Sequence, residues 1–173
     1  AGDVMAADAQ KMGALHDPDE TVLDEEMARA IIPFSAKPGN VQELRVRLMD
    51  AMWDDVGVMR DAAGLKRGIE KIASLKTDME NVGVSGDNLA FNLSWHDWLS
   101  LQSLIDTSEV IAKAGLSREN SRGAHFREDF PDAGSLDDSY FTIATSGDKG
   151  IEVSRESVKF TIVKPGESLL GAD

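Results

Sequence analysis

Three stretches of this chain repeat their apolar residues with the period of an α-helix, and this repeat constrains the fold more than any other feature. The first stretch begins after Asn40, which can cap a helix, and ends near Gly57. One helical stripe in it contains Val41, Leu44, Leu48 and Met52. The other stretches run from about 61 to 81 and from about 94 to 116. The third is apolar on more than one stripe, so it should pack against two neighbours. The pattern predicts a mainly α fold built on a three-helix bundle resembling a spectrin repeat.

Helix ends are predicted from the residues that commonly cap them. Ser94 followed by Asp97 is a start signal for the third helix. Gly83 stands where a residue of left-handed backbone conformation would end the second. A further helix over 23–32 should be capped by Asp17 or Asp19.

Downstream of the bundle the apolar period changes from that of a helix to two. Alternation over 141–143, 151–153 and 158–162 predicts short strands. Ser146–Gly150 is expected to form a hairpin loop, and Arg155–Ser157 is expected to join the second pair. The resulting small antiparallel β-hairpin or meander should cover one end of the bundle. We therefore predict an acidic helical segment over 1–39, the bundle over 40–132, and a β appendage with a tail over 133–173.

Charge and composition exclude several classes of function. The chain carries 18 Lys and Arg residues against 31 Asp and Glu residues, a net charge of −13. Nucleic acids and anionic membrane surfaces require a cationic face, so neither is expected as a partner. Without cysteine there is no disulfide, thiolate zinc site or iron–sulfur cluster. No apolar run approaches the roughly 18 residues of a membrane span and the start lacks a basic leader, so we expect a cytoplasmic chain without membrane insertion.

Familiar local motifs for metal and phosphate binding are absent from the sequence. Metal ligands usually recur at short spacing, and no such spacing relates the histidines His16, His96 and His125. No Gly-x-Gly-x-x-Gly follows a predicted strand, so a dinucleotide site is not expected. Helix punctuation is the better interpretation of Gly57, Gly64 and Gly68. Solvated surface is expected for the carboxylate pairs Asp54-Asp55 and Asp137-Asp138.

The stretch from 118 to 132 concentrates three arginines, a histidine and four acidic residues around Gly123. Such clustering is costly unless the groups pair, so a partly buried hydrogen-bond network is expected. Two interpretations remain open: a self-contained corner that holds helix to sheet, or an interface that binds something outside this chain.

The same stretch resembles a known family. Ser121-Arg122-Gly123-Ala124-His125 followed by Arg127-Glu128-Asp129-Phe130-Pro131 is similar to the C-terminal helical domain of succinate dehydrogenase/fumarate reductase flavoprotein subunits, relatives of L-aspartate oxidases and adenylylsulfate reductases. Upstream, 43–60 resembles the family's Leu-Arg … Met-Trp-(Asp/Glu)-x-Val-Gly-Val-x-Arg helix, so the resemblance covers about 40–132. The sequence departs from the family at Asn120, where Glu is usual, and over 139–142.

The resemblance implies a larger FAD-dependent oxidoreductase in which hydride moves between flavin and a dicarboxylate of the succinate/fumarate type. Its flavin-binding and capping parts lie N-terminal to the matched region, and Ala1–Gln10 resembles the last helix of the flavin domain. The chain is thus expected to be a fragment that binds no FAD or metal and holds no catalytic residue. Expected partners are the flavin-binding domain and an iron–sulfur subunit of a parent complex, which other subunits could attach to a membrane. Contacts to the missing domain are assigned to Arg118, Ser121, Arg122, Gly123, His125, Arg127 and Asp129.

An alternative function is a stand-alone acidic helical module that scaffolds a partner protein without catalysis. In that case, the family residues would serve packing alone. A third possibility, a small-molecule binding domain, would require a pocket.

Overall fold

The computed structural model describes residues 2–14, 17, 19–147 and 150–168. Two compact units divide the chain, Ala1–Ile32 and Pro33–Asp173. The segments expected from the sequence, 1–39, 40–132 and 133–173, stay a prediction about domains.

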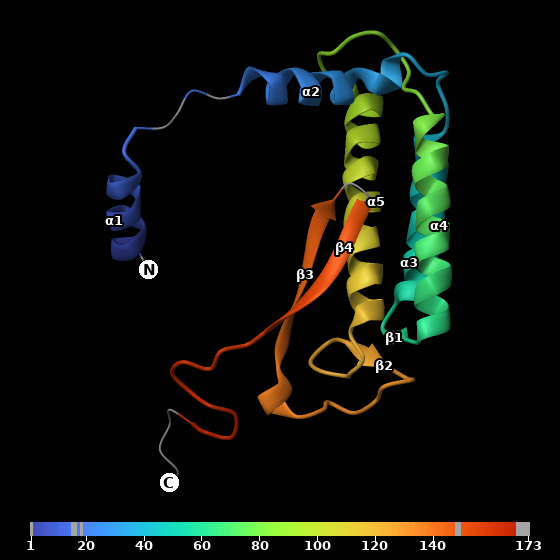
Figure 1. Cartoon of the computed structure of the whole chain (residues 1–173). Helices are drawn as coiled ribbons and strands as arrows, with labels where there is room; N and C mark the ends of the chain where they lie inside the picture. The colour runs from blue at the N-terminus through green and yellow to red at the C-terminus, as the bar shows by residue number, and fades with distance from the viewer. Residues whose placement is uncertain (1, 15–16, 18, 148–149, 169–173) are drawn as a thin grey trace. The chain divides into compact units, whose positions relative to one another are not determined.

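The first unit contains the helices α1 (Gly2–Met12) and α2 (Glu20–Ile31), neither of which buries a side chain within the described structure (Figure 1). Asp19 caps α2, because its carboxylate accepts hydrogen bonds from the Thr21 amide at 3.0 Å and the Thr21 hydroxyl at 2.6 Å. Of the two candidate caps, Asp19 is therefore the one used. The short helix η1 (Ile32–Phe34) follows α2.

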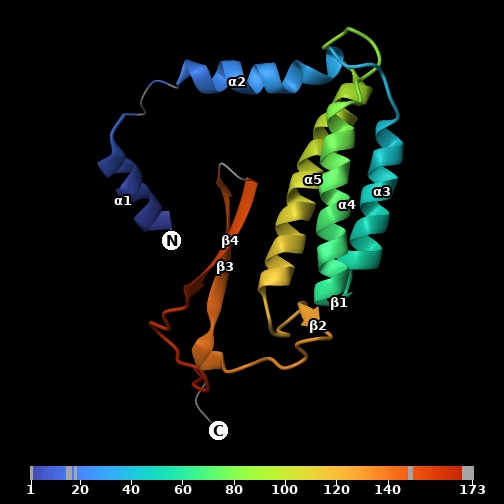
Figure 2. The ribbon, with the colours of Figure 1, turned by 45° about the vertical axis from the view of Figure 1, so that its right-hand side comes forward.

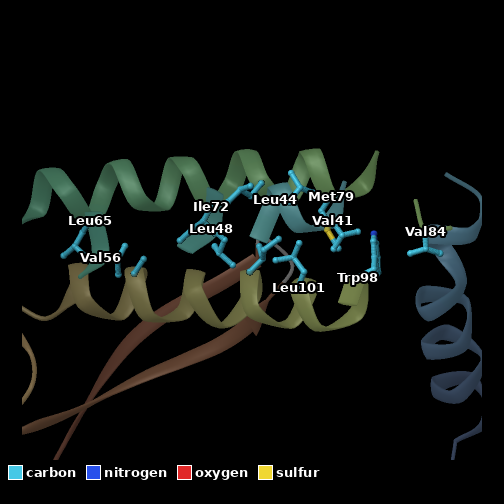
Figure 3. Close-up of a cluster of buried hydrophobic side chains, with 13 residues drawn as sticks. Val41, Leu44, Leu48, Val56, Leu65, Ile72, Met79, Val84, Trp98 and Leu101 are labelled. Carbon is cyan, nitrogen blue, oxygen red and sulfur yellow. The ribbon is translucent and has the colours of Figure 1, made fainter. Parts of the chain in front are cut away.

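The second unit contains the expected three-helix bundle. Its helices are α3 (Val41–Val56), α4 (Ala62–Glu80) and α5 (Leu93–Ser117), and each contacts both others (Figures 1 and 2). Figure 3 shows the buried side chains of the core, which lie between the helices except for Val84 beyond the end of the bundle. Each large buried side chain contributes roughly 1.5–3 kcal/mol by leaving water. The core cluster consists of Val41, Leu44, Leu48, Val56, Leu65, Ile72, Leu75, Met79, Val84, Trp98, Leu101, Ile105 and Ala112. The mainly α prediction is confirmed.

The start of α3 is as predicted, whereas the start of α5 is not. Asn40 accepts a hydrogen bond from the Glu43 amide at 3.1 Å. The cap of α5 is Asn92, which accepts from the Trp95 amide at 3.1 Å. Ser94 accepts from the Ser85 amide at 3.4 Å instead, so its assignment as the helix start was wrong. An asparagine two residues upstream offers the same capping chemistry, and local sequence does not decide between them.

Close backbone approach, and not a helix end, explains the glycines Gly83 and Gly68. α4 ends at Glu80 with Asn81 as its C-cap, and Gly83 does not have positive φ. A Cβ on Gly83 would overlap the carbonyl group of Ala36, where the chain passes η1. Gly68 lies buried inside α4, where a Cβ would come within 2.6 Å of the Val56 side chain. These glycines therefore permit contact between segments; they do not punctuate helices.

The C-terminal sheet is a hairpin of β3 (Tyr140–Gly147) and β4 (Gly150–Ser157), paired antiparallel with Gly147 opposite Gly150. Asp148 and Lys149 of the expected loop lie outside the described residues. The hairpin lies along α5, not over the end of the bundle, and the Lys113 ammonium donates to the Ile151 carbonyl at 3.0 Å (Figure 2).

The predicted third strand over 158–162 is absent from the described structure, and the predicted turn Arg155–Ser157 belongs to β4. Ile162 is 82% exposed, so the alternation there does not reflect a buried face. Period-two patterning predicts a strand only where one face is buried.

Asp55 is buried, contrary to the expectation of solvated surface. Its carboxylate accepts from the Arg67 guanidinium at 3.0 Å and the Lys71 ammonium at 2.6 Å, both on α4. Burial alone would raise the pKa of Asp55, but hydrogen bonds from Lys71 and Arg67 outweigh burial and lower it. The neighbours Asp54 and Asp55 therefore differ in role, because of the two only Asp55 joins α3 to α4 in the described structure.

None of the described helices combines the length and the apolar character needed to cross a membrane.

Gly68→Ala should lower the free energy of unfolding by about 1–2 kcal/mol. The added methyl group overlaps the Val56 side chain, and the cost of that overlap should exceed the roughly 1 kcal/mol that alanine gains over glycine in helix propensity. Chemical denaturation measures the change. In a Val56→Ala background the overlap is removed, so Gly68→Ala should there be neutral or stabilising. Equal destabilisation in both backgrounds would contradict the packing explanation.

Candidate functional site

A two-residue parallel pairing brings distant segments together at one end of the bundle. β1 (Met59–Arg60), between α3 and α4, pairs with β2 (Phe126–Arg127), which follows α5. The Glu128 amide donates to the Arg60 carbonyl at 2.7 Å. We call Arg60 together with residues 118–129 the arginine corner.

Arg127 is the buried centre of the arginine corner, with 1% of its surface exposed. Its Nη1 donates to the carbonyl oxygens of Gly115, Leu116 and Arg118, at 2.9, 3.1 and 3.2 Å. The last carbonyl groups of a helix lack partners within the helix. Arg127 therefore caps the C-terminus of α5 with a positive charge, which also suits the helix dipole.

Asp129 completes this arrangement and extends it to a second helix. Its carboxylate accepts from Nε and Nη2 of Arg127, each at 2.7 Å, and from the Ala62 amide at the start of α4 at 2.9 Å. The Arg127 hydrogen bonds are the main reason why the pKa of Asp129 falls from 3.8 to about 2. The pair thus links the end of α5 to the beginning of α4.

Arg60 caps the third helix end at the arginine corner. Its Nε donates to the carbonyl oxygens of Val56 and Gly57, at 3.0 and 2.7 Å, where α3 ends. Its Nη1 lies 3.0 Å from Nδ1 of His125. Because a guanidinium can only donate, Nδ1 must accept, and the proton of the neutral ring lies on Nε2. Nε2 is 3.2 Å from the Arg118 carbonyl oxygen, which accepts a hydrogen bond from it.

The electrostatic surroundings of His125 favour the neutral ring. Burial is the largest cause of its lowered pKa, and the positive charges of Arg60, Arg118 and Arg127 act in the same direction. The hydrogen bond to the Arg118 carbonyl opposes the shift. The neutral tautomer required by the Arg60 contact is therefore also the electrostatically preferred form.

The turn between Arg122 and His125 exposes the middle of the motif. The amides of Arg122 and His125 donate to each other's carbonyl groups, at 2.9 and 3.1 Å. Gly123 has φ +58°, as the first central residue of a type II′ turn requires, and a Cβ there would meet no atom of the described structure within 4 Å. Gly123 and Ala124 are both exposed.

Two further side chains of the motif anchor the loop that leads to the hairpin. Ser121 accepts from the Arg127 amide at 2.9 Å and donates to the Phe130 carbonyl at 2.8 Å. Arg122 donates to the Ser139 hydroxyl at 2.9 Å; its remaining described hydrogen bonds go to the carbonyl groups of Ala133 and Ser135. The loop is thus held by side chains of the motif.

Arg118 connects the arginine corner to the hairpin. Its guanidinium donates to Asn120 Oδ1 at 3.2 Å and to the Thr142 hydroxyl at 3.3 Å, and lies 5.0 Å from the Tyr140 ring centre. Arg155 lies 4.8 Å from the same ring centre and donates to the Ser117 carbonyl. Tyr140 thus has cation–π contacts with two arginines.

A hollow of about 430 Å³ opens beside these groups. We call it the arginine hollow; its lining consists of Arg60, Ile111, Ala114, Gly115, Arg118, Arg122, His125 and Thr142. No group of three or more His, Asp or Glu side chains is placed for metal binding in the part of the chain that the structure describes.

The structure brings together all seven residues assigned from the sequence, and the six side chains among them are hydrogen-bonded within the unit. Their assignment to contacts with another domain stays a prediction. Arg60, Thr142, Tyr140 and Arg155 were not assigned to the site. Arg60 ends the upstream segment that resembles the family, which was a usable signal; no local pattern marked the other three.

Comparison with known proteins identifies the family. Residues 45–169 match the model of the fumarate reductase flavoprotein C-terminal domain. The chain belongs to that family. It is 31% identical over 139 residues to an uncharacterized FAD-dependent oxidoreductase of Methanocaldococcus jannaschii, covering 73% of this chain and 25% of the relative. It is 30% identical over 135 residues to the fumarate reductase flavoprotein subunit of Mycobacterium tuberculosis, covering 76% of this chain and 23% of that relative.

The fold agrees with that family. The Mycobacterium smegmatis Sdh1 structure in complex with UQ1 superposes with a TM-score of 0.72 at 26% identity, covering 89% of this chain and 27% of that one. The matched part of the chain covers about a quarter of the length of each of these relatives.

Arg127→Met should lower the free energy of unfolding by about 3–5 kcal/mol, because three carbonyl groups at the end of α5 lose a buried charged donor and the exposed Asp129 loses its partner. Asp129→Asn should cost much less in that background than in the wild type. Arg47→Met, which breaks the exposed Arg47–Asp78 pair, is the control and should cost at most about 1 kcal/mol. Urea denaturation measures the free energy of unfolding of the three single variants and the double variant. Equal losses for Arg127→Met and Arg47→Met would contradict the role of Arg127 as a helix cap.

The lowered pKa of His125 predicts a loss of stability in mild acid. The unfolded chain takes up a proton near the ordinary value of 6.5, and the folded chain does so only at lower pH. Stability should therefore be complete above 6.5 and decline as pH falls from 6.5 toward the folded pKa. Unfolding free energies between about pH 7.5 and 5 test this, with His125→Gln removing that part of the slope. A pKa above 6.5 for the His125 ring, measured by NMR titration of the folded chain, would contradict this prediction.

Proposed function

We propose that this chain is the C-terminal helical domain of a larger FAD-dependent oxidoreductase that interconverts dicarboxylates of the succinate/fumarate type. The observation that carries the proposal is the match of 45–169 to a flavoprotein C-terminal domain, together with relatives about three times as long as this chain. The role proposed for the chain is to pack against the flavin-binding domain. An iron–sulfur subunit is a further proposed partner of the parent, and no residue of the chain is assigned to the chemical step.

The geometry supports a structural role in the parent. Arg60, Arg127 and Asp129 tie three helix ends to one another, which makes this end of the bundle a well-supported surface. Gly123 and Ala124 project from it as an exposed turn. On this basis we propose that the interface is built on the seven assigned residues, with the buried Arg127 supporting it from inside and with Gly123 and Ala124 as the direct point of approach.

The chain's own residues do not fit an FAD pyrophosphate. A strand leading into a helix N-terminus is the usual cradle, and β1 followed by α4 has that order. However, Asp61 accepts from the Gly64 amide at 2.6 Å and Asp129 accepts from the Ala62 amide. The carboxylates already occupy that helix end and would repel phosphate. This supports a flavin held by another part of the parent.

The first test is the coding sequence upstream of residue 1. We expect it to continue into a region with a dinucleotide-binding fingerprint, and purified parent protein to carry flavin. A start codon directly before this chain would overturn the proposal and favour the scaffold alternative.

Ala124→Arg tests the proposed interface. The side chain is exposed, so the isolated chain should keep its melting temperature. In the parent, the added bulk and charge should weaken packing of the flavin domain, lowering flavin occupancy and dicarboxylate turnover at least several-fold, as expected for a large side chain placed in a packed contact. Ala73→Arg, also exposed but on α4, is the control and should leave both unchanged. Full activity of the Ala124→Arg parent would exclude this turn from the interface.

A further inference from the structure

The arginine hollow has an excess of positive charge that the described residues do not balance. Arg127, which is not part of its lining, pairs with Asp129. None of the lining arginines, Arg60, Arg118 and Arg122, forms an ion pair with a described carboxylate. This occurs in a chain whose net charge is −13, where acidic partners are abundant. The hollow is thus a local cationic site on an acidic protein.

Two guanidinium groups of the hollow keep donors that the described structure does not use. The hydrogen bonds of Arg60 involve Nε and Nη1, and those of Arg118 also involve Nε and Nη1. In each, Nη2 has no hydrogen-bond partner among the described residues. All three nitrogens of Arg122 are bonded, so this arginine contributes charge more than free donors.

The position of these groups favours an anion. The hollow lies partly out of solvent, and burial lowers the pKa of Arg60. A charge withdrawn from water without a partner carries a desolvation cost, which an anion can offset. Ile111 and Ala114 add an apolar wall, which strengthens the electrostatic attraction nearby. His125 already accepts from Arg60, so it holds that guanidinium in place without neutralising it.

We propose that the arginine hollow binds an anionic oxygen group, either carboxylate or phosphate, through Nη2 of Arg60 and Nη2 of Arg118. Guanidinium groups bind both kinds of anion with charge-assisted hydrogen bonds. The anion has two conceivable sources: a small free anion, or the carboxylate of an acidic side chain from the rest of the parent. The assignment depends only on the geometry of this chain, and the second source alone rests on the proposed function.

The first experiment titrates the 173-residue chain separately with succinate and inorganic phosphate, against sodium chloride of equal ionic strength. A free anion in the hollow should give saturable shifts of the Arg60 and Arg118 Nε–Hε signals in NMR spectra. Arg118→Gln should abolish the saturable shift at Arg60. Lys66→Gln, which removes one exposed positive charge elsewhere, should retain both shifts.

The second experiment supplies the carboxylate from within the chain. Ile111 is 40% exposed and lines the hollow. Ile111→Glu should melt about 2–4 °C above Ile111→Gln at low salt, a difference that high salt should reduce. The matched control is Leu104, 43% exposed on the same helix and absent from the lining. Leu104→Glu should melt no higher than Leu104→Gln, and both Ile111 variants avoid the risk of removing a structural arginine.

The two experiments together decide the proposal and the source. Saturable shifts that disappear in Ile111→Glu identify a free anion. No saturable shift, but a stabilising Glu–Gln difference confined to position 111, shows that the hollow holds a carboxylate only when a protein chain supplies it, which supports an acidic side chain of the parent as the source. If neither the shifts nor that difference appears in chains that remain folded, the proposal is overturned. Both experiments use the isolated chain, so a failure of the proposed oxidoreductase function would not change their outcome.

Discussion

The arrangement at this end of the molecule depends on one buried guanidinium. Arg127 enters the interior and donates to three carbonyl groups at the end of α5, where partners within the helix run out. Its charge is matched by Asp129, which in turn accepts from the first amide of α4. A neutral donor in the same place would satisfy carbonyl groups but would not hold Asp129. The charge is therefore what couples two helix ends through a single pair of side chains.

The same corner separates paired charges from unpaired ones. Around Arg127, donors and acceptors are matched, as buried polar groups must be. Toward the hollow, Arg60 and Arg118 keep part of their donor capacity. The two alternatives that the sequence left open are therefore not exclusive. Arg127 serves the internal network, while the groups around the hollow are suited to an external ligand.

How much could be foreseen from the sequence depends on the range of the interactions involved. The three helices follow from their apolar stripes, because burial of one face is a local periodic property. Ser94 was misassigned as a cap because the local pattern does not show that Asn92 competes for the same role. The alternation over 158–162 was misassigned as a strand because the pattern does not show whether anything covers its apolar face. Asp55 and Gly68 depend on side chains of a neighbouring helix, so their positions could not be read locally. The clustering of residues 118–129 was visible in the sequence, and the upstream family segment contained Arg60, but the β1–β2 pairing that joins the two could not be predicted from either.

The two-residue pairing of β1 with β2 also has a consequence for the order in which the molecule assembles. The contact between Ala62 and Asp129 spans 67 positions along the chain, so closing it carries a large entropic cost until α4 and α5 are side by side. Native contacts of such long separation generally form late in folding. During synthesis, a ribosome must have released residue 129 before the three helix termini can be secured together. The contacts of the arginine corner should therefore form only after the three helices of the bundle have packed together.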